Sequence, residues 1–183
     1  MEIYFPHQEH NTFRGFVNGK KEYLQLPVLV KSLNEKQIAV VDYIARGYTY
    51  DEIADELSVT RRCVDQRLDR IKSKLDLVSR WDIVKTCVEH NVIDLNEVTR
   101  DFDLRLVWGL PNHAIKKLKI LAESVGAVNM NKYIADKLHI LPVSVSRSME
   151  DIYFKLGVRN HIQAGLVYKA AVNELDKQVS VLA

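Results

Sequence analysis

The sequence predicts a mainly α-helical protein made of two consecutive four-helix units, joined by a linker helix and preceded by a short β-hairpin. Between positions 33 and 176, apolar residues recur at spacings of three and four, which is the period of helices that bury one side. A segment of the first unit also returns 81 residues later, because IADKL at 134–138 repeats the pattern of IADEL at 53–57. The chain therefore reads as a tandem repeat of one helical unit.

The predicted boundaries follow from these patterns. They are an N-terminal extension at 1–32, a first unit at 33–93, a linker helix at 94–109, a second unit at 110–176 and a tail at 177–183. In the extension, Asn18-Gly19 stands between two strand-like segments. This dipeptide favours a type I′ hairpin turn, in which both central residues need positive φ. Pro27 is expected to end the second strand.

The composition of the chain limits which classes of function it can have. The chain has 183 residues, of which 47% are hydrophobic and 27% charged, as in an ordinary globular protein. Its net charge is only +2, so a case for nucleic-acid binding must rest on local clustering. No apolar run suits a signal peptide or a membrane span, and a cytoplasmic location is expected. No pattern typical of a catalytic, metal or cofactor site is present, so we expect a protein that is not an enzyme and has no cofactor.

The helix predicted near 61–75 combines an apolar stripe with a basic face. Val64, Leu68, Ile71 and Leu75 recur at spacings of four, three and four. Six Lys or Arg against two Asp between 61 and 74 give a local charge of +4. The face opposite the stripe and its flanks carry Arg61, Arg62, Gln66, Arg67, Asp69, Arg70, Lys72, Ser73 and Lys74. Arg suits phosphates and guanine edges, and Gln pairs with adenine, so this helix suits the major groove of DNA.

The segment before that helix completes a helix-turn-helix. Thr49 and Glu52 have the spacing of a capping box, which starts a short helix. A three-residue turn follows, and Thr60 can cap the basic helix. A short helix, a tight turn and a basic helix in this order form a DNA-binding motif.

Residues 33–80 resemble the LuxR/GerE-type DNA-binding domain and align with it without a gap. The matching residues are Leu33, Val40, Ala45, Gly47, Glu52, Ile53, Ala54, Leu57, Val59, Val64, Leu68, Arg70, Ile71, Lys74, Leu75 and Arg80. The resemblance implies a helical domain that reads the major groove. It also implies that Asp65 and Asp69 stand where the family often has Lys or Asn and reads bases. An Asp there either accepts from cytosine or limits non-specific phosphate binding.

The fourth helix of the first unit is predicted near 80–90, with Ser79 and Asp82 as its capping box. In the resembled family this helix is the usual dimer contact. Trp81 then has two interpretations, which the sequence leaves open. It packs within its own domain, or it belongs to a contact between two domains.

The corresponding helix of the second unit has diverged. Its buried stripe remains as Val145, Met149, Ile152 and Leu156, but the charge between 142 and 155 is two cations minus two acids, or zero. Its outer face carries Val143, Arg147, Glu150, Asp151 and Phe154. Val143 and Phe154 suit contact with a protein partner, whereas Ser144, Ser146 and Arg147 remain candidates for DNA contact.

These features predict a transcription regulator that binds double-stranded DNA sequence-specifically, mainly through its first unit, and whether it is an activator or a repressor stays open. The predicted DNA-contact residues are Thr60, Arg61, Arg62, Asp65, Gln66, Arg67, Asp69, Arg70, Lys72, Ser73, Lys74, Ser144, Ser146 and Arg147. RNA polymerase, another regulator and a second copy of the chain stay open as partners. The sensory half common in the resembled family is missing, so no small-molecule ligand is expected. The alternative is a protein-interaction module, such as an antiactivator or a polymerase-binding factor.

Overall fold

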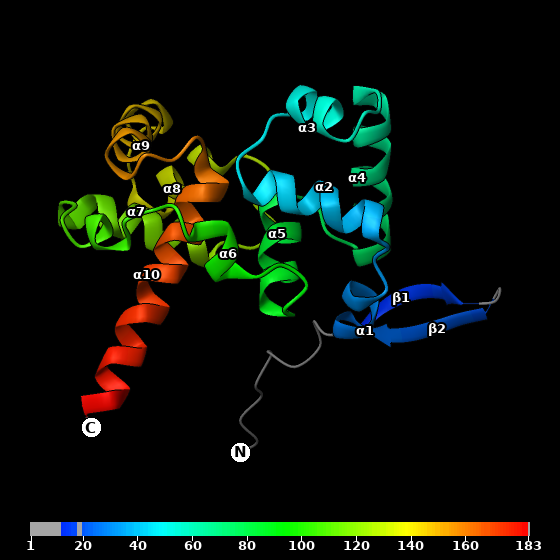
Figure 1. The fold of residues 1–183 in the computed structure, drawn as a ribbon. Coiled ribbons are helices and arrows are strands. Elements are labelled where there is room, and N and C mark those ends of the chain that lie inside the picture. The colour runs from blue at the N-terminus through cyan, green and yellow to red at the C-terminus, as the bar shows by residue number, and fades with distance from the viewer. Residues whose placement is uncertain (1–11, 18–19, 183) are drawn as a thin grey trace, which may run out of the picture.

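The computed structural model describes residues 12–17 and 20–182, and it is mainly helical (Figure 1). Its elements are β1 (Thr12–Val17), β2 (Lys20–Gln25), α1 (Leu26–Lys31), α2 (Glu35–Ala45), α3 (Tyr50–Glu56), α4 (Arg61–Leu75), α5 (Arg80–Glu89), α6 (Leu95–Thr99), the 3-10 helix η1 (Leu104–Val107), α7 (Asn112–Glu123), α8 (Met130–Leu138), α9 (Pro142–Leu156) and α10 (His161–Leu182). We call residues 26–93 the first half and residues 110–182 the second half.

The N-terminal strands β1 and β2 pair antiparallel, with Phe13 opposite Leu24. The predicted turn residues Asn18-Gly19 lie outside the described residues. Strand β2 ends at Gln25, and α1 begins directly at Leu26. The chain thus turns into a helix where Pro27 was expected only to end a strand, because a proline fits the first turn of a helix.

Short capping motifs start the helices of the first half as the sequence predicts. Asn34 and Gln37 form a capping box at α2, with Gln37 N donating to Asn34 Oδ1 over 3.0 Å. Ser79 and Asp82 do the same at α5. Gly47 follows α2 with a φ of +82°, a left-handed conformation that glycine adopts without a steric penalty. These local bonds satisfy backbone groups at the helix ends and fix where each helix begins or ends.

The linker differs from the prediction of one continuous helix. Residues 95–107 form two short helices, α6 and η1, with a break between them. Asp103 causes the second start, since its carboxylate accepts from the backbone N–H of Arg105 over 3.1 Å. A short polar side chain of this kind competes with continued helix hydrogen bonding and begins a new turn.

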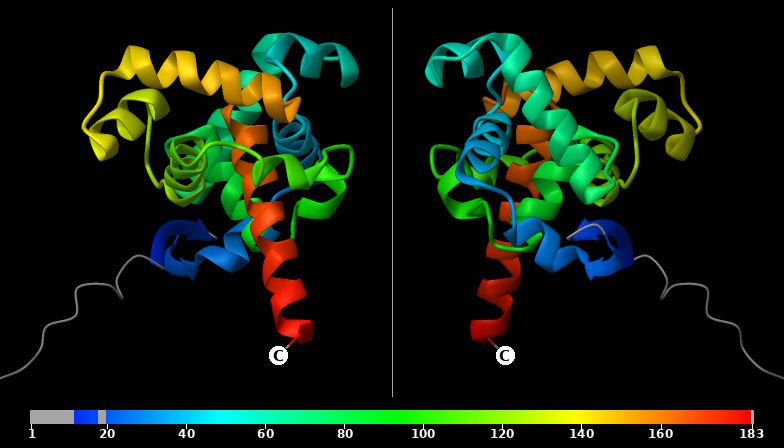
Figure 2. Two further views of the ribbon diagram at one scale, coloured as in Figure 1. Left: turned by 90° about the vertical axis from the view of Figure 1, so that its left-hand side faces the viewer. Right: turned by 90° about the vertical axis from the view of Figure 1, so that its right-hand side faces the viewer.

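The second half ends in one long helix instead of a helix and a tail. Asn160 caps α10, because its Oδ1 accepts from the backbone N–H groups of Ile162 and Gln163 over 2.9 and 3.2 Å. The helix then runs through the predicted tail at 177–183 as far as Leu182. Its last turns extend away from the rest of the molecule (Figures 1 and 2). The apolar and polar residues after 171 therefore continue the helix without a core beneath them.

The two halves meet along α5 and α10, and we call this contact the seam. One continuous cluster of buried residues runs from Leu29 in the first half to Ala171 in the second. Trp81 on α5 is only 1% exposed, and it lies against Gly165 on α10. Helices α4 and α9 lie on opposite sides of this central pair (Figure 1). Trp81 thus belongs to a contact between the halves within one chain.

Candidate nucleic-acid interface

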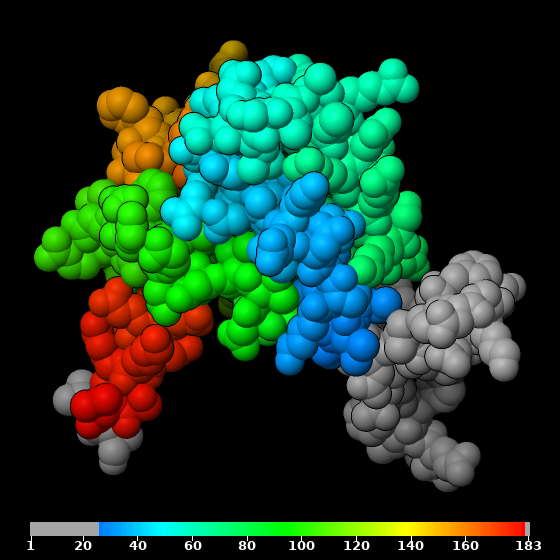
Figure 3. Space-filling model, turned by 45° about the vertical axis from the view of Figure 1, so that its right-hand side comes forward, coloured from blue at the N-terminus to red at the C-terminus, as the bar shows by residue number. Residues whose placement is uncertain are grey.

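Helix α4 buries one side and leaves the other open. Val64, Leu68, Ile71 and Leu75 are at most 1% exposed, as the predicted stripe requires. The opposite side is exposed, and it carries Arg62, Gln66, Asp69, Arg70 and Ser73. Figure 3 shows the side chains of α4 projecting along the right-hand edge of the molecule, clear of the second half. The basic face of this helix is accessible to a large ligand.

The turn before α4 gives the helix its position. Thr49 caps α3 and forms the predicted box, since Thr49 N donates to Glu52 Oε2 over 2.7 Å. Ser58 takes a φ of +50° in the turn, and Thr60 then caps α4 by accepting from the backbone N–H of Cys63 over 3.3 Å. Helices α3 and α4 pack directly on one another, so the arrangement is a helix-turn-helix.

Some cations of α4 are already engaged. Arg61 lies 3.0 Å from the Asp51 carboxylate, and the Lys74 ammonium donates to the Ser32 carbonyl oxygen over 2.6 Å. Lys72 is 3.8 Å from Asp69. Within the part of the chain that the structure describes, no ion pair involves the three remaining cations of the helix, Arg62, Arg67 and Arg70. These three are therefore the cations most readily available to phosphates.

The two acids of α4 both lie near Tyr50. Asp65 is half-buried, and both Asp65 and Asp69 act on Tyr50, whose pKa is raised mainly by burial and further by these two charges. The Arg80 guanidinium lies over the Tyr50 ring, 5.5 Å from its centre. The acids thus sit beside Tyr50, in a region that also holds Arg80. Sequence reasoning did not place Arg80 at this site, although Arg80 is one of the residues that match the resembled family.

Helix α9 of the second half presents a different surface. Its stripe is buried as predicted, with Val145, Met149, Ile152 and Leu156 at most 3% exposed. Phe154 is 89% exposed and Val143 is 55% exposed. Ser144 and Arg147 are exposed and Ser146 is half-buried. Helices α4 and α9 are not brought together on one surface (Figure 1), so the predicted DNA-contact residues fall into two separate groups.

The seam is bonded in a reciprocal way that the sequence did not reveal. Asp82 at the start of α5 accepts from the backbone N–H of Gly126, in the loop after α7, over 3.1 Å. Gln163 at the start of α10 donates to the carbonyl of Arg46, just after α2, over 2.7 Å. Positions 82 and 163 differ by 81, which is the repeat offset found in the sequence. Each half thus holds the other through an equivalent side chain.

Further contacts across the seam tie the second half to the helix-turn-helix itself. Arg159 forms an ion pair with Glu52, the capping residue of α3. This pair, together with the hydrogen bonds from Thr49, lowers the pKa of Glu52 to about 2. The Arg159 guanidinium also lies 5.8 Å from the centre of the Tyr48 ring. The start of α3 is therefore braced by the second half.

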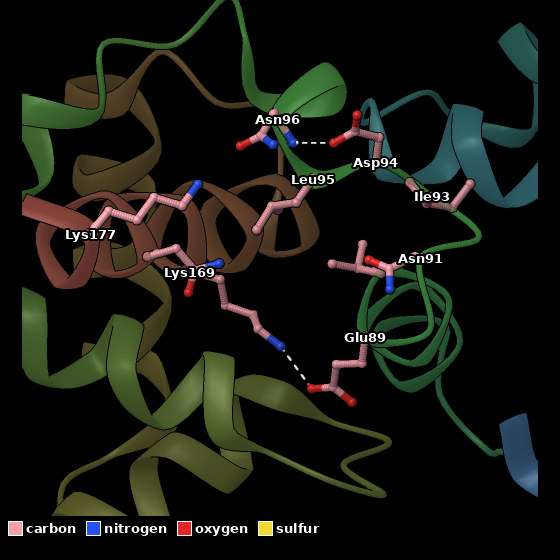
Figure 4. A pocket seen from close by; sticks show the side chains of 10 residues that line it. Glu89, Asn91, Ile93, Asp94, Leu95, Asn96, Lys169 and Lys177 are labelled. Atoms are coloured by element: carbon pink, nitrogen blue, oxygen red, sulfur yellow. Dashed lines mark hydrogen bonds and ion pairs between the residues drawn. The ribbon is translucent and has the colours of Figure 1, made fainter. Parts of the chain in front are cut away.

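A hollow of about 560 Å³ lies near the far end of the seam, between the end of α5 and α10 (Figure 4). Three of the four charged side chains in its lining have a partner among the described residues. The Lys169 ammonium is 2.8 Å from the Glu89 carboxylate, and the Asp94 carboxylate accepts from the backbone N–H of Asn96 over 2.9 Å. The pair of Lys169 with Glu89 joins the two halves at this point.

Comparison with known proteins agrees with the geometry of the first half. The family model described as bacterial regulatory proteins, luxR family, GerE, matches residues 31–87. Residues 31–87 form a LuxR/GerE-type helix-turn-helix domain. The match indicates a DNA-binding transcription regulator, and domains of this type are typically not enzymes. The family match ends at residue 87 and does not extend to the second half. No curated protein and no solved structure matches the chain.

The LuxR/GerE-type domain contains α2 to α5 and the complete helix-turn-helix. Among the described residues, no group of three or more His, Cys, Asp or Glu side chains is arranged to hold a metal ion. No helix in the described part of the chain has both the length and the apolar character needed to cross a membrane.

Proposed function

We propose that the protein is a sequence-specific regulator of transcription that reads double-stranded DNA with α4 of its LuxR/GerE-type domain. The observation that carries this proposal is the exposed basic face of α4. Arg62 and Arg70 are fully accessible, and Gln66 lies between them on the same face. Two guanidinium groups and an amide on a convex helix suit guanine, adenine and phosphate contacts in the major groove.

The remaining polar groups of the helix-turn-helix hold the backbone of the duplex. Thr60 is exposed at the start of α4, and Arg67 lies at the side of the helix without an ion pair among the described residues. Phosphate contacts of this kind fix the register of a protein on DNA but carry no sequence information. The bases are then read by the side chains nearest the middle of the exposed face.

The second half serves as an internal partner of the first. Its helices α7 to α10 follow the order of α2 to α5, and the reciprocal contacts of Asp82 and Gln163 support descent from one repeated unit. In domains that the first half resembles, the fourth helix joins two chains. Here the corresponding helix, α5, is covered by α10 of the same chain, with Trp81 only 1% exposed. We therefore expect the chain to act as a single molecule whose two halves pair internally, with α4 as the helix that reads DNA.

The test starts with selection of bound duplexes from a random-sequence pool, followed by affinity measurement on the selected site. The double substitution Arg62→Ala and Arg67→Ala removes two unpaired cations without touching the buried stripe. Each lost contact costs about 1–3 kcal/mol, so the affinity should fall by tenfold or more.

A matched double substitution controls for the loss of two charges. Arg100 and Arg105 lie on the linker with side chains 61% and 90% exposed, and Arg100→Ala with Arg105→Ala should leave DNA affinity within about twofold of the original value. Equal losses in the two double variants, or unchanged binding after substitution of Arg62 and Arg67, would contradict reading by α4.

A second candidate function is a protein-docking module, and the outer face of α9 favours it. Phe154 is 89% exposed and Val143 is 55% exposed on a helix with no net charge between 142 and 155. Large exposed apolar side chains are characteristic of contact surfaces. The double substitution Phe154→Ser and Val143→Ser should abolish capture of purified RNA polymerase while DNA affinity stays the same. The control is Leu175→Ser with Val179→Ser, at exposed apolar positions near the end of α10.

A further inference from the structure

We propose that a cavity at the seam, beside α4, binds a small organic anion with an apolar body, such as an aromatic carboxylate. The cavity has a volume of about 230 Å³ and draws its walls from both halves. Lys72 of α4 and Arg80 of α5 come from the first half, whereas Met130 of α8 and His161 of α10 come from the second. It is distinct from the hollow drawn in Figure 4.

The polar lining of this cavity is rich in donors. Lys72 and Arg80 supply two cations, and no Asp or Glu is among the residues that line the cavity. The nearest described carboxylate partner of Lys72 is Asp69, at a distance of 3.8 Å, which is long for a charge-assisted hydrogen bond. An anion in the cavity would therefore meet positive charge that the protein itself neutralises only in part.

Trp81 adds a buried aromatic residue to the lining of the cavity. Trp81 lines the cavity, is 1% exposed, and has an indole Nε1 that is buried without a hydrogen-bond partner among the described residues. This atom has almost no accessible surface, so a bound anion would meet Lys72 and Arg80 and not the indole N–H.

Apolar residues also line the cavity, and they would contact the body of the ligand. Ala127 and Met130 form part of the wall, and Val78 and Val128 are 60% and 81% exposed at its edge. A neighbouring crevice of about 430 Å³ shares Tyr50, Arg80 and His161 with the cavity. Ligand pockets usually combine apolar walls with a few convergent polar groups. The small volume favours a ligand of roughly ten non-hydrogen atoms, with room to extend into the crevice.

Occupancy would act on DNA binding through Lys72, and this consequence rests on the proposed function. Lys72 belongs to both the cavity and the helix proposed to enter the major groove. An anion held by Lys72 and Arg80 competes with phosphates for the same cations, so the occupied protein should bind DNA more weakly. A binding site for a ligand would then lie inside the tandem unit, where the sequence predicted none.

The direct test uses the indole N–H signals of the full chain in nitrogen-15 NMR spectra, because the chain has only two tryptophans. Trp108→Phe assigns the signal that remains to Trp81. Benzoate is the probe, with benzamide as its neutral analogue and acetate as an anion without an apolar body. Benzoate should shift the Trp81 signal saturably, with a dissociation constant on the order of 1 mM. Benzamide and acetate should each bind about tenfold more weakly.

Substitutions connect the shift to the cavity. Arg80→Gln should weaken benzoate binding about tenfold, whereas Arg100→Gln on the linker should leave it unchanged. Lys72→Gln gives the same comparison at a second cation if the spectrum of Arg80→Gln shows loss of folding. A Trp81 signal that does not move at about 20 mM benzoate overturns the site. Equal binding of benzamide or acetate, or no effect of either substitution, overturns the proposed ligand class.

The effect on DNA is measured separately, by titrating the selected duplex in the presence of benzoate or benzamide. Benzoate should weaken binding of the original protein about threefold or more at saturation, and benzamide should not. A chain that binds benzoate but no DNA would refute the proposed function and leave the ligand site standing. Equal DNA affinity with and without saturating benzoate would overturn the coupling through Lys72.

Discussion

Trp81 and Gly165 are in contact across the seam, so that a Cβ atom added to residue 165 would lie 2.6 Å from Cη2 of the Trp81 indole. The missing side chain lets α10 approach the ring on α5, and both residues are buried. Glycine in the middle of a helix costs about 1 kcal/mol relative to alanine, so its presence within α10 needs a packing reason. The indole of Trp81 supplies that reason.

Gly165→Ala should destabilise the protein although alanine is the better helix former. The added methyl group meets a fixed aromatic ring, and overpacking of this kind costs about 1–3 kcal/mol. We expect a net loss of about 1 kcal/mol or more in the free energy of unfolding, measured by urea denaturation. Gly109→Ala is the control, since the nearest atom to its added Cβ is 3.5 Å away. A stabilised Gly165→Ala variant would mean that the two helices are not held this closely.

One chain should occupy one selected DNA site. The α5 surface is already covered by α10 of the same chain, so a second copy has no access to Trp81 without opening the seam. Sedimentation of the protein with a labelled duplex should give a complex of one chain and one duplex. Two chains on each site would contradict the internal pseudo-dimer. In that case the variant Gln163→Ala, which loses the hydrogen bond to Arg46, should increase the share of complexes with two chains.

The stability of the protein should depend on pH through His161. Burial, and next the charge of Arg80, lower the pKa of His161 to about 4 from its ordinary value of 6.5. Between these two values the unfolded chain binds a proton that the folded protein does not bind. The free energy of unfolding should therefore fall as pH falls from about 6.5 to about 4, by about 3 kcal/mol.

His161→Gln removes this titration and should flatten the dependence in that window. The measurement is urea denaturation at pH 7, 6, 5 and about 4, compared with His113→Gln at an exposed position. Parallel curves for the original protein and the His161 variant would show that His161 is solvated. Carboxylates contribute below this window, where loss of the Glu52 charge, with a pKa of about 2, should destabilise the protein further.

Salt should weaken DNA binding with a slope that reports the number of phosphate contacts. Each neutralised phosphate contributes about 0.9 to the slope of log affinity against log salt concentration. Arg67→Gln should reduce the slope by about 1, because Arg67 has no ion pair among the described residues and is free to hold a phosphate. Arg61→Gln should reduce it less, since Arg61 is already 3.0 Å from Asp51. The opposite ranking would show that the pair with Asp51 opens on DNA.

Local signals in the sequence predicted the helices of the first half well. The boxes of Thr49 with Glu52 and of Ser79 with Asp82 involve residues three apart, so their hydrogen bonds are nearly independent of the rest of the fold. The burial of the stripe on α4 also follows from its spacing. The same reasoning wrongly predicted one continuous helix over α6 and η1, because apolar spacing does not show that Asp103 caps a new helix.

The sequence by itself determined where the helices of the helix-turn-helix start, which side of α4 is buried and which side carries charge. These features depend on residues within a few positions of one another. Only the tertiary structure decided that Asp82 binds Gly126, that Gln163 binds Arg46, and that Lys72, Arg80 and His161 share a cavity. The two hydrogen bonds join residues 44 and 117 positions apart. Hydrophobic periodicity shows that one side of a helix is buried, but it does not show which other part of the chain covers that side.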